Sequence, residues 1–131
     1  MKKKKHLIDP NVLRRIEQAN EVTAVEYNLL KKMRENLIIE FNKFLKNNLL
    51  VMPTVTIKPP LLENCKNNKY YDEANSASLR NTTLANYMNG CSISIPYFEN
   101  KNPIGIMLNA TTNEDVYLLN ISSEIEKVLQ K

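Results

Sequence analysis

Side chains that could bind or react with a ligand gather in the stretch SLRNTTLANYMNGCSISIP, Ser78 to Pro96. Thr82 and Asn86 lie four positions apart, so on a helix they share one face and can bond to neighbouring loops. Two interpretations are open for this pair, a tie between helix and loop or a direct contact with substrate, and we favour the tie. Arg80 and Asn81 stand near the start of the same helix, where they could face a pocket but better suit capping or solvent contact.

Candidate nucleophiles are present, but their surroundings argue against catalysis. Ser92 and Ser94 alternate with apolar residues, as expected for the polar side of a strand. Cys91 follows the carboxyl end of a helix, whereas a thiol is activated at an amino end, so we expect an inert core residue. Lys58 stands beside two prolines without a nearby serine, and His6 lies in a lysine-rich leader. We therefore predict no catalytic residue in this chain.

Cysteine and histidine spacing predicts neither a metal site nor a cofactor. Cys65 and Cys91 form no CxxC pair, and His6 is the single histidine, which excludes familiar zinc-ligand patterns. No apolar run approaches the ~20 residues that a membrane helix needs, and no signal peptide is recognisable. We expect reduced thiols, no membrane association and a cytoplasmic location.

Charge is concentrated at the start of the chain. The formal net charge is +4, and the lysines at positions 2–5 account for it, since the remaining chain balances 14 basic with 14 acidic residues. A run of this kind is usually a solvated leader. We predict a basic disordered tail over residues 1–8, a single folded segment over residues 9–131, and no contact with nucleic acid.

Four helices are expected from capping signals and apolar spacing. Asp9 before a proline starts a helix that reaches about residue 19. Thr23 and Glu26 form a capping box ahead of a long helix that ends at residues 47–48. A short helix covers 79–88. Thr112 caps a last helix whose inward stripe we predict as Val116, Leu119, Ile125, Val128 and Leu129.

The strands are expected at residues 49–52, 91–95 and 104–108. Pro53 and Pro96 should end the pairing of the first two strands, because proline donates no ladder bond. Residues 63–78 show no period and predict a surface loop with room for one helical turn. The first two strands are joined through a helix, which favours a parallel crossover, and the last two should pair antiparallel. The fold class is therefore α/β, with a mixed sheet of three to four strands and about four helices. Gly90 should cap the short helix at a positive φ.

These blocks together resemble a known family. The run LRNTTLANYMNGCSISIP is similar to the carboxy-terminal segment of amidase-signature enzymes, which include amidases and the amidase-like subunit of aminoacyl-tRNA amidotransferases. There, a helix with T-x-x-x-N is followed by a glycine turn and a strand that ends in proline, which here are Thr82, Asn86, Gly90 and Pro96. LLVMPT and NPIGIMLNATTNEDVYLLNISSEIE resemble flanking blocks, so the likeness covers residues 9–128. It implies part of an α/β/α layered domain.

The resemblance implies hydrolysis of carboxylic amides by a serine, a second serine and a lysine base. Those residues belong to a Gly/Ser-rich signature in the amino-terminal half of the family, and this chain has only two glycines, Gly90 and Gly105. We expect a truncated fragment that is inactive alone and lends strands and pocket walls to a separately encoded amino-terminal half, or that self-associates. The implied positions near substrate are Arg80, Asn81, Thr82, Asn86 and Gly90. The alternative is a small non-enzymatic binding or regulatory module that reuses this fold.

Overall fold

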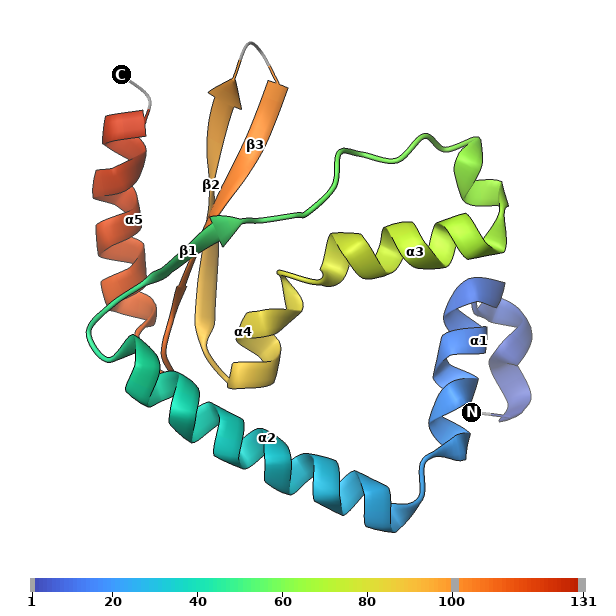
Figure 1. The fold of residues 1–131 in the computed structure, drawn as a ribbon. Coiled ribbons are helices and arrows are strands. Elements are labelled where there is room, and N and C mark those ends of the chain that lie inside the picture. Colours follow the sequence, from blue (N-terminus) through green and yellow to red (C-terminus); the bar gives the residue numbers. More distant parts are fainter. Residues whose placement is uncertain (1, 100–101, 130–131) are drawn as a thin grey trace. The chain divides into compact units, whose positions relative to one another are not determined.

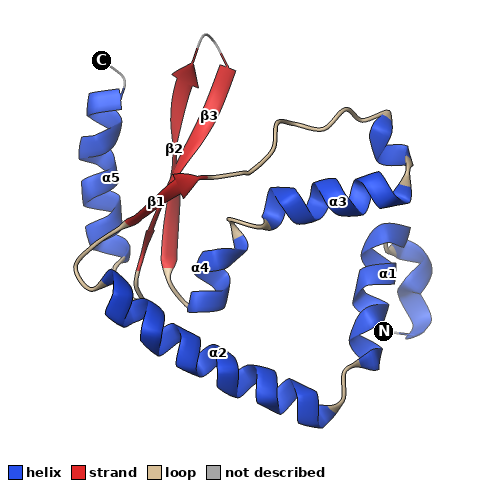
Figure 2. Ribbon diagram, in the orientation of Figure 1, coloured by secondary structure: helices blue, strands red, loops and turns tan. Residues whose placement is uncertain are grey.

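The computed structural model describes residues 2–99 and 102–129 (Figure 1). The chain forms two compact units, Met1–Glu35 and Asn36–Lys131. Helix α2, Ala24–Leu45, runs through the boundary between them. Figure 2 shows that all three strands belong to the second unit, while the first is helical.

The first unit holds η1 (Lys2–Leu7), α1 (Pro10–Gln18), η2 (Ala19–Glu21) and the start of α2. Asp9 caps α1 by accepting from the N–H groups of Asn11 and Val12 at 2.9 and 3.2 Å. The predicted capping box also forms: the N–H of Glu26 donates to Thr23 Oγ1 at 3.2 Å, and the Glu26 carboxylate accepts from the Thr23 N–H at 2.8 Å. Both predicted helix starts are confirmed. The division into a disordered tail and an amidase-like segment stays a prediction.

The second unit contains the sheet, whose strands are β1 (Leu50–Pro53), β2 (Cys91–Glu99) and β3 (Asn102–Ala110) in the order β1-β3-β2. The α/β class is confirmed, but the mixed sheet is wrong, because both pairs in the described sheet are antiparallel. β1 and β2 run in the same direction, as a crossover requires, yet β3 lies between them. The hairpin puts β3 beside β2, and β3 then offers its other edge to β1.

Of the two prolines predicted to end strands, Pro53 is the last residue of β1, as expected, whereas Pro96 does not stop the pairing of β2. Pro53 is opposite Ile106, and Pro96 is opposite Gly105 inside a longer strand. The Thr54 N–H donates to the Gly105 carbonyl at 2.8 Å, so the backbone polar groups of Gly105 face β1. Its partner Pro96 therefore directs its nitrogen away from β3. By the same alternation Pro53 faces away from β3 at the opposite edge, where a missing N–H breaks no ladder bond.

Helix α5 (Asp115–Leu129) packs on one face of the sheet, against β2 and β3, and α4 (Thr83–Met88) contacts β2. In Figure 1 the two helices lie on either side of the strands, which gives the expected layers. The core centres on four buried residues: Ile95, Leu108, Ala110 and Leu118.

The stripe predicted for α5 is correct at Ile125 and Leu129, which pack partly buried against the core. It is wrong at three positions that are 73%, 57% and 67% exposed, Val116, Leu119 and Val128, while Leu118 and Ser122 are buried instead. The predicted cap is wrong too, since Thr112 Oγ1 donates to the Asn89 carbonyl at 2.7 Å. The helix begins at Asp115, so the Leu118 N–H bonds to the Glu114 carbonyl.

Residues 63–78 are not a loop, because they contain η3 (Asn64–Lys66) and most of α3 (Asn68–Leu79). The amide of Asn67 caps α3 by accepting from the Tyr70 N–H at 3.1 Å. α3 ends where we expected the short helix to begin, and α4 starts four residues later.

Asparagine, not glycine, takes the left-handed conformation in this chain. Asn47, Asn89 and Asn113 have φ of 62°, 53° and 66°, and neither glycine has a positive φ. Asn89 is the C-cap of α4, which corrects the role we predicted for Gly90. Gly90 is required for space instead: a Cβ there would lie 2.5 Å from the Ala110 carbonyl oxygen.

Candidate functional site

The five positions that the resemblance implies lie along the end of α3, the turn after it, α4 and the start of β2. Asn81 Nδ2 donates to the Pro53 carbonyl at 2.7 Å. That carbonyl faces away from β3, so Asn81 caps an outward acceptor at the free edge of β1. Thr56 Oγ1 donates to the Ala77 carbonyl at 2.8 Å. Together these bonds fix the chain after β1 against the corner between α3 and α4.

The other motif positions carry similar structural contacts. Thr82 Oγ1 donates to the Leu79 carbonyl at 3.2 Å, and the neighbouring Thr83 hydroxyl donates to the same carbonyl at 2.9 Å. Both hydroxyls therefore satisfy acceptors at the carboxyl end of α3. Arg80 is the exposed C-cap of α3, and Asn86 is exposed on α4. A contact of these residues with substrate stays a prediction.

A hydroxyl pair that sequence reasoning missed lies on the sheet face opposite α5. Thr54 Oγ1 and Ser94 Oγ are 2.5 Å apart and meet across β3 at Gly105. A Cβ at Gly105 would press against both hydroxyls, so the second glycine of the chain is what lets them meet. The signal available in the sequence was a glycine inside a strand, which often marks a close approach.

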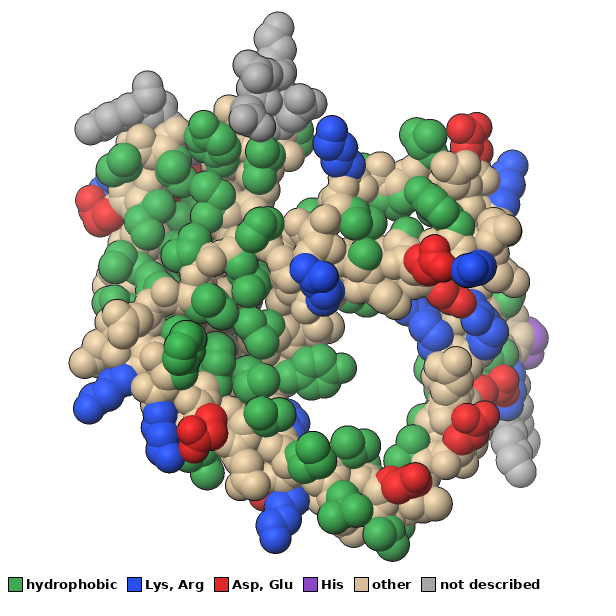
Figure 3. Space-filling model, viewed as in Figure 1, with side chains coloured by type: hydrophobic (Ala, Val, Ile, Leu, Met, Phe, Trp, Pro, Cys, Tyr) green, Lys and Arg blue, Asp and Glu red, His purple; other side chains and the backbone are tan. Residues whose placement is uncertain are grey.

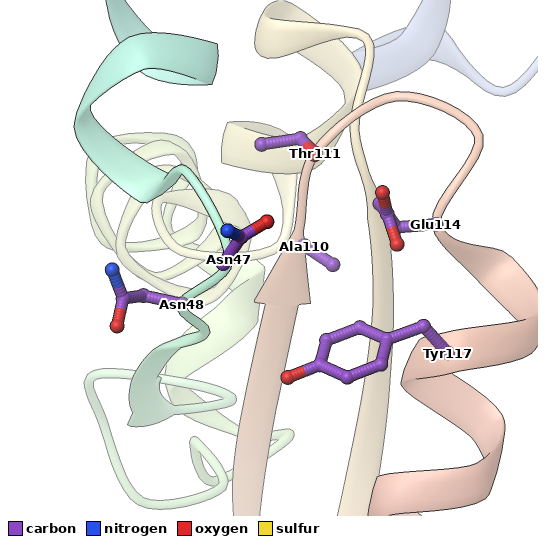
Figure 4. A pocket seen from close by; sticks show the side chains of 6 residues that line it. All are labelled: Asn47, Asn48, Ala110, Thr111, Glu114 and Tyr117. Carbon is purple, nitrogen blue, oxygen red and sulfur yellow. The ribbon is translucent and has the colours of Figure 1, made fainter.

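A pocket of about 260 Å³ lies beside the end of β3 (Figure 4). It is lined by Asn47, Asn48, Ala110, Thr111, Glu114 and Tyr117. The asparagines come from the turn between α2 and β1, and the Tyr117 ring extends from α5 across the strands toward that turn. The carboxylate, phenol and amides could bind a small polar ligand. None of these six residues was among the predicted site residues.

Cys91 lies next to this pocket, and its Sγ donates to the Thr111 carbonyl at 3.5 Å. Burial, followed by the nearby charge of Asp115, raises the pKa of the Cys91 thiol. A raised pKa keeps the thiol protonated at neutral pH and makes it a poor nucleophile. The inert role expected for Cys91 stays a prediction.

The remaining candidate nucleophiles and bases are not among the six residues that line this pocket. Ser92, Lys58 and His6 are exposed. Within residues 2–99 and 102–129, no group of three or more His, Cys, Asp or Glu side chains could hold a metal ion. In the same residues, no helix combines the length and apolarity needed to cross a membrane.

The chain is similar in sequence to several known proteins. Over 125 residues, or 93% of this chain, it is 27% identical to 2-amino-5-chloromuconic acid deaminase of Comamonas testosteroni. It is 29% identical over 126 residues, 95% of the chain, to translocon at the outer membrane of chloroplasts 64 of Pisum sativum. A third relative is a glutamyl-tRNA(Gln) amidotransferase subunit of Saccharolobus solfataricus, with 34% identity over 105 residues, 79% of the chain. No solved structure matches the chain.

These matches span only part of each relative. They cover 27%, 21% and 20% of the lengths of the deaminase, the translocon protein and the amidotransferase subunit, respectively. The amidase family model matches residues 1–119, most of this chain. The chain belongs to the amidase family.

Proposed function

We propose that this chain supplies the carboxy-terminal strands and helices of an amidase-type hydrolase and has no activity alone. In this proposal the serine, second serine and lysine that attack a carboxylic amide lie in family sequence that this chain does not span. The chain acts in the cytoplasm, in keeping with two unpaired cysteines. It contributes the sheet and the walls around a site completed by the remainder of the domain.

One observation carries the proposal: the chain aligns over 93% of its own length with a relative of which it covers 27%. The contacts of the motif residues are consistent with it. Asn81 and Thr82 bond to backbone carbonyls, and Gly90 leaves room for the backbone of β3, as wall residues should. None of them is paired with a base that could activate a nucleophile.

Ammonia release from amides tests this proposal. The chain alone should release no ammonia from a panel of simple carboxylic amides. The matched comparison is a chimera of the Comamonas deaminase in which this chain replaces the 125 matched residues; it should release ammonia from its parent's substrate. Turnover by the purified chain, or a folded chimera that is inactive, would contradict the proposal.

A second candidate is a non-enzymatic binding module, favoured by the relative named for a chloroplast translocon and by the polar pocket in Figure 4. It predicts a saturable ligand or protein partner other than the rest of an amidase. A candidate ligand or partner whose titration shifts the NMR signals of Thr111 and Tyr117 to saturation would support it. Saturable binding to the remainder of an amidase, with no effect at this pocket, would count against it.

A further inference from the structure

The free edge of β2 offers backbone groups that no described strand uses. Among the described strands β2 pairs only with β3. The orientation of Gly105 fixes which residues face outward: Pro96 points away from β3, and so does every second residue from it. Ser92, Ser94 and Phe98 therefore present their N–H and C=O groups at the edge, while Ile93 and Ile95 bond to β3.

The opposite edge of the sheet, formed by β1, is less available for pairing with an added strand. β1 is four residues long, and its outward positions are Val51 and Pro53. Pro53 has no N–H, and its carbonyl is occupied by Asn81 Nδ2 at 2.7 Å. Short strands, prolines and side-chain caps are the ordinary ways of blocking an edge. β2 is nine residues long and has one outward proline, so it is the more open edge.

A groove runs beside this open edge and contains an unsatisfied polar atom. The groove has a volume of about 220 Å³ and lies between Ile93–Pro96 of β2 and Leu119, Ser122, Ser123 and Glu126 of α5. Ser122 is 3% exposed, and its Oγ has no hydrogen-bond partner among the described residues. An orphaned buried hydroxyl costs about 1–3 kcal/mol, so a partner that supplies a polar group there would be favoured.

Exposed apolar side chains flank the open edge on both faces of the sheet. Leu119 is 57% exposed on α5, and Phe98 is 65% exposed on β2, on the same face as Ser94 and opposite α5. Figure 3 shows hydrophobic side chains gathered over α5 and the sheet of the second unit. Backbone groups, a groove and an apolar margin are what an added strand requires: the backbone gives affinity, and the groove takes alternate side chains.

We infer that the edge of β2 from Ser92 to Phe98 docks an extended strand of the amidase domain that this chain does not span. The inference rests on the proposed function and names where the two parts join. The occupant follows from the comparisons, because family relatives extend well beyond the matched segment, which covers 20–27% of their lengths. Its strand bonds to Ser92 and Ser94, turns apolar residues toward Leu119, and offers a polar group to Ser122 Oγ.

Amide hydrogen exchange tests the docking edge directly. In the isolated chain the amides of Ser92 and Ser94 should exchange fast, and those of Ile93 and Ile95 slowly, because only the latter bond to β3. In the chimera described above, Ser92 and Ser94 should slow by at least about tenfold, while Val51 should not change. Activity of the chimera reports on the function, and exchange reports on the edge. An active chimera with fast exchange at both serines would remove this inference alone, and a protected but inactive chimera would remove the function alone.

Proline substitutions supply the matched variants. Ser94→Pro removes one outward N–H of β2, and Val51→Pro removes one from the opposite edge; neither N–H bonds to β3. Ser94→Ala keeps the N–H but loses the hydroxyl pair with Thr54. In the chimera only Ser94→Pro should restore fast exchange at Ser92. Equal effects of the two prolines, a chimera that does not fold, or concentration-dependent protection in the isolated chain, which would indicate a second copy, would each overturn the assignment.

Discussion

Replacing Gly90 by alanine should destabilise the second unit even though Gly90 has no left-handed φ. The new methyl would lie 2.5 Å from the Ala110 carbonyl oxygen, where ordinary van der Waals contact of a Cβ begins at 3.4 Å. The obstacle is the backbone of β3, and Ala110 is paired with Cys91, so it cannot rotate aside. Overpacking costs about 1–3 kcal/mol, and the loss of glycine's freedom in the unfolded chain returns about 0.4–1 kcal/mol. From the middles of these two ranges, the expected net loss is about 1.3 kcal/mol.

Gly105→Ala is the comparison, because its new methyl would meet the side chains of Thr54 and Ser94. Rotation can move the two hydroxyls, but the Thr54 Cβ would also lie 2.8 Å from the new methyl and does not move when the side chain rotates. Trimming Thr54 to glycine should therefore relieve much of the cost at Gly105, with a coupling of at least about 0.5 kcal/mol. No side-chain trimming should relieve the cost at Gly90.

Urea unfolding followed by circular dichroism measures both effects, provided that the slope against urea is unchanged. A loss below about 0.5 kcal/mol for Gly90→Ala, set against the 1–3 kcal/mol typical of overpacking, would refute the steric account. The steric account would also be refuted if Gly105→Ala lowered the free energy of unfolding equally in the Thr54 background and in the trimmed Thr54 variant.

Three further outcomes are expected. Leu108→Ala, at a site 1% exposed, should cost about 2–5 kcal/mol in urea unfolding, because little can collapse into the cavity. The backbone N–H and then the hydroxyl of Thr23 lower the pKa of Glu26. The start of α2 should therefore be stabilised at pH values above the ordinary pKa of glutamate and should lose that stability as the pH falls through the lowered pKa. NMR chemical shifts of the first turn should follow this titration, and Glu26→Gln should abolish the pH dependence. In a Cys65→Ser variant, Cys91 should react with iodoacetamide more slowly than free cysteine at neutral pH, since burial and Asp115 raise its pKa; an equal rate would contradict this.

Local signals in the sequence were sufficient for the helix starts and the hairpin. Asp9 and the Thr23–Glu26 box form the expected bonds, because capping depends on residues within three positions of each other. Residues 91–95 and 104–108 do pair antiparallel. A signal that depends on the whole sheet was misread: Pro96 looks like a strand end, but β2 continues to Glu99 because the Pro96 nitrogen points away from β3.

The faces of α5 and the existence of α3 were also beyond the sequence pattern. Val116, Leu119 and Val128 satisfy a helical spacing but remain exposed, since apolar content alone does not say which of two stripes meets the sheet. α3 contains Asn, Ser and Tyr and lacks an apolar period, so its helix depends on the Asn67 cap and its contacts with η3.

The candidate site was predictable only where the resemblance supplied a motif. Asn81, Thr82 and Gly90 were singled out by it, but their actual partners, carbonyls at Pro53, Leu79 and Ala110, come from other elements. The Thr54–Ser94 pair joins residues forty positions apart. Such a pairing follows from strand register, which a single sequence does not fix.

Asparagine and glycine have different structural roles in this protein. Asn47, Asn89 and Asn113 make the turns that other L-residues resist, since their short amides tolerate that geometry. The two glycines instead occupy positions where a side chain would not fit: Gly90 lies against the backbone of β3, and Gly105 lies against the hydroxyls of Thr54 and Ser94. A chain with few glycines and many asparagines can therefore still form tight turns. Exchanging the two residue types between these five positions would not be neutral.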